Sequence, residues 1–327
     1  MKKLYSLLFL LLLSFGLLTG CGDGKDKQVK EDDSSKNTEQ VDQAETAAFP
    51  VTIKDALDNE VVIEEKPAKI VSLIPSNTEI AFELGLGDEI VGVSDFDNYP
   101  EEAAKKEKIG GMEFNVEKII SLSPDLVLAH ESTALNSTEG LQQLRDSGIK
   151  VFVVDDAQSI DAVYESILMV GKATGTVKEA ETTVKAMKEK LAEIESKIAD
   201  IADKKVVYVE VGPAPENYTT GKNTFMDGML TILKAENVAG DQEGWVIMDQ
   251  EALLQKNPDV IITTYGDYVE DPIGQVMNRD GWQDVSAVKN KQVADVNSDL
   301  VTRSGPRIIE GIEELAKAIY PEIFKNE

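Results

Sequence analysis

Residues 117–128 read EKIISLSPDLVL, and residues 251–262 read EALLQKNPDVII. In both stretches a glutamate leads a short helical pattern, the helix stops before Pro-Asp, and an apolar strand follows. The repeat therefore predicts two similar lobes with a cleft between them.

Strand-like and helix-like patterns alternate around the repeat. Amphipathic segments precede or follow the apolar runs at 70–74, 90–93 and 206–211. A short hairpin is expected from 51–53 and 61–63, which flank an Asp-Asn turn. We expect Ser76 or Asn77 to cap the helix that follows 70–74. The alternation predicts mostly parallel sheets covered by helices on both faces.

One long helix is predicted between the halves. Apolar residues recur every three or four positions from 176 to 203, which is typical of an amphipathic helix. A coiled-coil dimerisation helix has the same pattern, but in the middle of an α/β chain a strut between lobes is favoured. We expect Rossmann-like lobes at 49–175 and 204–327, each with a central, mostly parallel sheet, joined by this helix.

The N-terminus is typical of an exported, lipid-anchored protein. Two lysines precede an apolar run that ends in Leu18-Thr19-Gly20-Cys21, so residues 1–20 are predicted to be a signal peptide. Cys21, the only cysteine, is the expected lipidation site, although an ordinary secretory signal with an incidental cysteine has the same pattern. Residues 21–48 are polar and are expected to form a flexible linker.

Charge and residue usage exclude several functions. The formal net charge of −27 argues against nucleic-acid binding, which needs basic patches. His130 is the only histidine. A zinc or manganese site, or any catalytic site, that needs two or more histidines therefore cannot form. We expect no enzyme activity, no resident cofactor and no metal site.

Polar and aromatic residues follow several predicted strands, at the edge where open α/β sheets place their ligands. Singly, each aromatic residue is more simply explained by packing. Together they favour a large, partly apolar planar ligand. They are Phe96, Asn98, Tyr99, His130, Glu131, Tyr218, Thr220, Trp245, Asp299, Thr302 and Arg303.

The motif IVSLIPSNTE at 70–79, the segment 91–100 and the two Pro-Asp repeats resemble one family. It is the periplasmic-binding-protein class that serves vitamin B12, haem and ferric-siderophore ABC importers, and the vitamin B12-binding members are the most similar. The resemblance implies the class III fold with limited lobe closure, and a monomer that works with a permease and its ATPase. It also implies that Glu117 and Glu251 dock on permease arginines. A lipid anchor on the extracytoplasmic face fits a Gram-positive cell membrane.

The resemblance also implies corrinoid contacts at Tyr218, Trp245, Asp299 and Arg303, to which the strand-end pattern adds Phe96, Tyr99 and His130. Where vitamin B12 binders have tryptophan, this chain has Gly111 and His130. His130 could donate to a corrin amide or ligate a tetrapyrrole metal. A corrinoid is therefore the first hypothesis and haem or a ferric siderophore the second. A metal chaperone or metal-dependent enzyme using Asp95, Asp97 and Asn98 is the third.

Overall fold

The computed structural model describes residues 49–324. The predicted signal peptide, Cys21 and the 21–48 linker lie outside these residues. Within the compact unit Ala44–Glu327, the described part contains two central sheets, a hairpin and their covering helices. A chain that begins at Gly22 therefore keeps this whole unit. No helix among residues 49–324 is both long and apolar enough to cross a bilayer.

The predicted hairpin opens the fold. Strands β1 (Val51–Lys54) and β2 (Glu60–Ile63) pair antiparallel. The Asp55 carboxylate accepts hydrogen bonds from the backbone N–H groups of Leu57 and Asn59, each at 2.9 Å, which closes the turn.

The N-lobe has one parallel sheet in the order β5-β4-β3-β6-β7. The chain moves outward from β3 in one direction and then crosses to β6 on the other side, so a strand-order switch point lies between β3 and β6. The strands are β3 (Ile70–Ser72), β4 (Ile90–Val93), β5 (Glu107–Lys108), β6 (Leu126–His130) and β7 (Lys150–Val154). The helices are α1 (Pro75–Glu83), α2 (Glu101–Ala104), α3 (Val116–Leu122), α4 (Glu131–Ala134), α5 (Thr138–Asp146) and α6 (Ile160–Thr174).

The C-lobe sheet is mixed, with the order β11-β9-β8-β12-β13 and β10 beside β8. The pairs among β10, β8, β12 and β13 are parallel, whereas β9 and β11 are antiparallel additions. The strands are β8 (Val206–Glu210), β9 (Tyr218–Thr220), β10 (Glu236–Asn237), β11 (Trp245–Ile247), β12 (Val260–Thr263) and β13 (Val293–Asp295). The helices are α8 (Phe225–Ile232), α9 (Gln250–Lys256), α10 (Pro272–Met277), α11 (Ser286–Lys289), α12 (Ser298–Thr302) and α13 (Ile308–Ile319).

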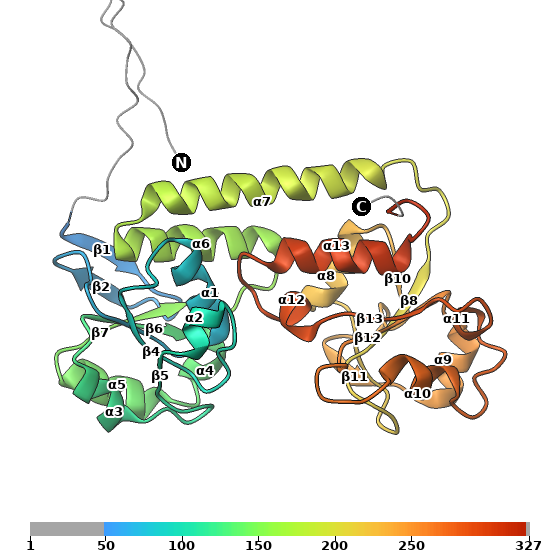
Figure 1. Ribbon diagram of the computed structural model, residues 1–327, viewed down its shortest axis with the longest axis horizontal. Helices are drawn as coiled ribbons and strands as arrows, with labels where there is room; N and C mark the ends of the chain where they lie inside the picture. Colours follow the sequence, from blue (N-terminus) through green and yellow to red (C-terminus); the bar gives the residue numbers. More distant parts are fainter. Residues whose placement is uncertain (1–48, 325–327) are drawn as a thin grey trace, which may run out of the picture. The chain divides into compact units, whose positions relative to one another are not determined.

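A single long helix, α7 (Val177–Lys197), connects the two lobes, as predicted. It packs on α6 from the N-lobe and on α13 from the C-lobe (Figure 1). Gly171 on α6 allows the close approach, because a Cβ atom there would lie 2.5 Å from Cβ of Ala180 on α7. The largest hydrophobic cluster is continuous from the hairpin through α7 to α13, so the helix belongs to the core of the fold.

The sequence repeat has the same structure in both lobes. α3 and α9 each end at a residue in the left-handed region, Ser123 with φ 51° and Asn257 with φ 45°. The aspartates that follow, Asp125 and Asp259, accept backbone N–H bonds at the start of the neighbouring strands, at 2.9 Å from Lys69 and 3.0 Å from Val206. Each Pro-Asp turn thus fixes the entry of one central strand.

The predicted cap of α1 is wrong. The N-cap residue is Ile74, and Pro75 occupies the first turn, where its missing N–H costs nothing. Ser76 and Asn77 are buried inside the helix. Asn77 donates from Nδ2 to the carbonyl oxygen of Ala129 at 2.9 Å, so its side chain ties α1 to β6 instead of capping α1.

Candidate functional site

Two predicted aromatic residues meet on the C-lobe. Tyr218 begins β9 and Trp245 begins β11, and these strands pair antiparallel. The two rings stack with centroids 6.1 Å apart and planes inclined by 19°. Both side chains stay partly exposed, with 37% and 47% of their surface open. We predicted that they follow strands of the sheet, whereas each begins a short strand of its own, β9 or β11.

The stacked rings border a hollow of about 330 Å³, here called the C-lobe hollow. Its remaining lining comes from the ends of β8 and β12 and from α12. The lining residues are Val211, Tyr218, Trp245, Thr264, Tyr268, Ser298 and Thr302.

Tyr268 is the main site residue that the sequence analysis missed. It is 69% exposed and lies in the loop after β12, the strand of the second repeat. Its ring centroid is 6.3 Å from that of the buried Tyr265. The rule that ligand residues follow strand ends, applied to 260–263, would have identified it.

A buried ion pair supports this part of the C-lobe. The Glu210 carboxylate at the end of β8 is fully buried. Arg279 donates to its two oxygens at 2.7 Å each, and the Tyr265 hydroxyl donates at 2.6 Å. Burial and the adjacent Glu210 raise the pKa of Tyr265, so it stays a donor at neutral pH. This network fixes the loop that carries Tyr268.

Asp299 and Arg303 are brought together on α12 and at its end, with the Arg303 guanidinium 2.8 Å from the Asp299 carboxylate. Arg303 also contacts the N-lobe. It donates to Glu79 and to Oδ1 of Asn98, each at 2.8 Å. The Asp-x-x-x-Arg pair therefore links the lobes.

Phe96 and Tyr99 lie in the loop after β4, with 53% and 45% of their surfaces exposed. One face of the Tyr99 ring is covered by Arg307, whose Cζ lies 3.7 Å from the ring centroid. Beneath the loop, the Ser94 hydroxyl donates to the buried Asp97 carboxylate at 2.5 Å. Burial raises the pKa of Asp97 above its ordinary value, although Ser94 acts in the opposite direction.

The oxygen ligands proposed for a metal are not gathered around an ion site. Asp97 turns inward to Ser94, and Asn98 Nδ2 donates to Asp299 at 2.8 Å. Within residues 49–324, no group of three His, Cys, Asp or Glu side chains is arranged to hold a metal.

His130 is the last residue of β6 and is 4% exposed. Its Nδ1 lies 3.3 Å from the backbone nitrogen of Ser132, which donates to it, and 2.8 Å from the Ser132 hydroxyl. Burial lowers the pKa of His130, although Asp156, Glu131 and Asp155 act in the opposite direction. A neutral ring that accepts at Nδ1 carries its proton on Nε2, which makes Nε2 a hydrogen-bond donor.

Glu117 and Glu251 occupy equivalent places in the two lobes. Each lies in the first turn of the repeat helix and is exposed. Asn115 caps α3 by accepting from Lys118, and Asp249 caps α9 by accepting from Glu251 and Ala252. Both glutamates also suit the positive end of a helix dipole, which is worth about 0.3–1 kcal/mol.

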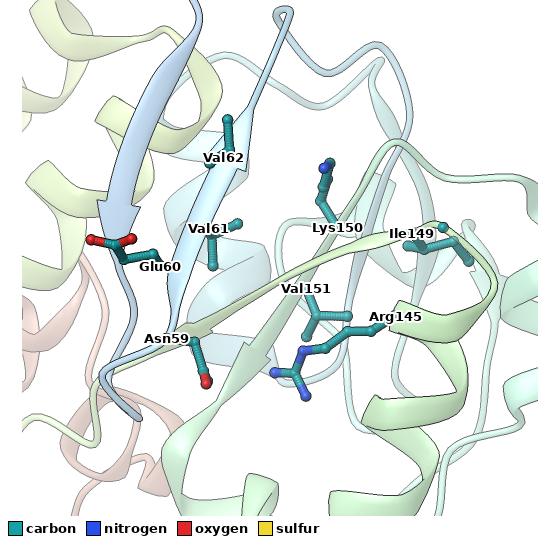
Figure 2. A pocket seen from close by; sticks show the side chains of 9 residues that line it. Asn59, Glu60, Val61, Val62, Arg145, Ile149, Lys150 and Val151 are labelled. Carbon is teal, nitrogen blue, oxygen red and sulfur yellow. The ribbon is translucent and has the colours of Figure 1, made fainter.

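A separate pocket of about 380 Å³ lies between β2 and β7 (Figure 2). It contains Arg145 and Lys150 but none of the predicted site residues. Nη2 of Arg145 is buried and has no hydrogen-bond partner within residues 49–324. No aromatic ring lines the pocket, so it offers little contact to a planar ligand.

Residues 70–300 match a protein family described as periplasmic binding protein. The chain belongs to this family. This periplasmic binding protein is 50% identical over 331 residues to an uncharacterised ABC transporter substrate-binding lipoprotein, YvrC, of Bacillus subtilis, with 100% of both chains covered. It is 30% identical over 282 residues to a cobalamin-binding protein of Halobacterium salinarum, which covers 84% of this chain and 75% of that protein.

A solved structure confirms the fold. A possible iron-binding, periplasmic solute-binding protein of Staphylococcus epidermidis superposes with a TM-score of 0.71 at 40% identity, over 78% of this chain and 100% of that one. The periplasmic binding protein described here is thus the substrate-binding protein of an ABC transporter and not an enzyme, as the sequence predicted.

Proposed function

We propose that this periplasmic binding protein captures a corrinoid and delivers it to an ABC importer. The observation that carries the proposal is the stacked Tyr218–Trp245 pair beside Tyr268 at the C-lobe hollow. Rigid rings provide a large contact area to a flat ligand at a low cost in conformational entropy. The similarity to a cobalamin-binding protein supports the same ligand class.

Haem or a ferric siderophore is the second candidate. The similarity to a possible iron-binding protein supports it, and an imidazole such as that of His130 is a common ligand of haem iron. The hydrogen bond that Nδ1 of His130 accepts favours a donor role for Nε2 over ligation, which is why a corrinoid with peripheral amides remains the first choice.

Delivery and anchoring follow from the same proposal. Glu117 and Glu251 would present one carboxylate per lobe to permease arginines, and the permease would work with its ATPase. Cys21 would carry the lipid that holds the protein at the extracytoplasmic face of the membrane, since the Bacillus subtilis relative is named a lipoprotein. Multiple acyl chains on one cysteine bind a bilayer firmly.

The test is a visible-absorption titration of the Gly22–Glu327 chain with cyanocobalamin, aquocobalamin, haemin and ferric siderophores. Saturable binding of both cobalamins is expected, and Trp245→Ala should weaken it about tenfold, which is ~1.4 kcal/mol. Ile273→Ala, at an exposed apolar residue outside the hollow, is the control. Binding of haemin or an iron chelate alone would reject the corrinoid and select the second candidate.

A further inference from the structure

A buried carboxylate of the N-lobe holds two arginines of the C-lobe. Glu79 lies on α1 with 3% of its surface exposed. Arg307 donates to it from Nε at 2.9 Å and from Nη2 at 2.8 Å, and Arg303 donates from Nη1 at 2.8 Å. A carboxylate this deeply buried is stable only when opposite charges and hydrogen bonds compensate for its lost hydration.

The same two arginines hold the loop after β4. Arg303 donates to Oδ1 of Asn98 at 2.8 Å and to the backbone oxygen of Phe96 at 3.4 Å. Arg307 covers the ring of Tyr99. Phe96 and Tyr99, the predicted ligand contacts in the loop after β4, therefore lie in a segment that the C-lobe arginines contact. Glu79 in turn holds both arginines by hydrogen bonds.

Glu79 contributes to the charge balance of this cluster. Glu79 and Asp299 supply two negative charges against the two positive charges of Arg303 and Arg307. Without the Glu79 charge, one carboxylate faces two guanidinium groups, and these repel each other inside a poorly hydrated interface.

We propose that Glu79 is the positioning residue that sets the spacing of the two lobes and orients the Phe96–Tyr99 loop for ligand capture. Arg303 can then exchange its Asn98 and Phe96 contacts for a ligand while Glu79 continues to hold it. The proposal does not depend on which ligand is bound.

The experiment measures the lobe-to-lobe distance. The Gly22–Glu327 chain contains no cysteine, so Gln143→Cys on α5 and Asn290→Cys after α11 give two unique exposed sites for spin labels. Electron–electron double resonance should give one narrow distance distribution for this background. Glu79→Gln keeps the side-chain shape and should broaden the distribution about twofold, because both arginines lose their shared charge. Glu83→Gln, an exposed residue on the same helix, is the matched control.

A second variant keeps the test valid if Glu79→Gln does not fold. Arg307→Gln removes a partner from the opposite lobe and should broaden the distribution in the same way. In the double variant the two effects should not add, because both act through one contact. A distribution as narrow as the background in folded Glu79→Gln, or in folded Arg307→Gln, overturns the proposal.

Discussion

Replacing Arg279 by methionine should destabilise the C-lobe strongly. Glu210 is fully buried and receives two hydrogen bonds from Arg279 and one from Tyr265. Arg279→Met leaves this carboxylate with the tyrosine alone, and breaking a buried pair from one side costs about 3–5 kcal/mol. The guanidinium also lies 4.5 Å from the ring centroid of Trp282, a contact that the substitution removes.

Urea unfolding of the Gly22–Glu327 chain measures the loss, with circular dichroism reporting on the whole domain. Trp282 is buried in the C-lobe and reports on that lobe by its fluorescence. The double variant Glu210→Gln/Arg279→Met should recover about 2 kcal/mol relative to Arg279→Met, because no uncompensated charge remains. Lys289→Met, which removes an exposed ion pair of the same lobe, should stay close to wild type. A loss below about 1 kcal/mol for Arg279→Met would refute the reasoning.

Three further outcomes are expected. Glu117→Arg and Glu251→Arg should each reduce binding of the ligand-loaded protein to membrane vesicles of its own bacterium about tenfold. Glu113→Arg, which changes an exposed charge nearby, should leave this binding unchanged. Equal losses of binding for all three variants would contradict docking at the repeat helices. Burial holds the pKa of His130 in the folded chain below its ordinary 6.5, so the unfolded chain takes up the proton more readily. The free energy of unfolding should therefore fall as the pH drops from 7 through 6.5 toward the lowered pKa of the folded state. His130→Gln should lack that part of the pH dependence in urea titrations, and identical slopes would disprove the assignment. Tyr268→Ala should weaken ligand binding by about 1–2 kcal/mol in calorimetry without lowering stability, and unchanged affinity would place the ligand away from the hollow.

The sequence predicted the class of fold because its signals are periodic and local. The repeat at 117–128 and 251–262 gave the two lobes, and the spacing of apolar residues gave α7. The long helix α6 was not predicted, although Ser159 caps it and Gly175 ends it in the left-handed region, which are ordinary boundary signals. The antiparallel strands β9 and β11 are three residues long, too short for a period-two pattern to emerge.

The candidate site was predictable only in part. Residues at strand ends were identified because a parallel sheet gathers them at one edge. The partner of Arg303 was not, since Glu79 is 224 positions away and lies in a helix whose sequence gives no sign that a glutamate will be buried. A single Asp or Glu in a sequence is usually an exposed surface residue. A buried carboxylate is therefore recognised only when the structure shows the arginines or lysines that pair with it.

The order of strands along the chain has a consequence for folding. The N-lobe sheet is complete once residue 154 is available, and the C-lobe sheet uses only residues 206–295. Within the described residues, neither sheet contains a strand from the other lobe. Each sheet can therefore form without the entropy cost of closing a loop that spans both lobes. At the end of the chain, α13 returns to α7. Assembly can therefore proceed from the N-terminus onward, and the docking of Ile308–Ile319 is the step that commits the second lobe to the first.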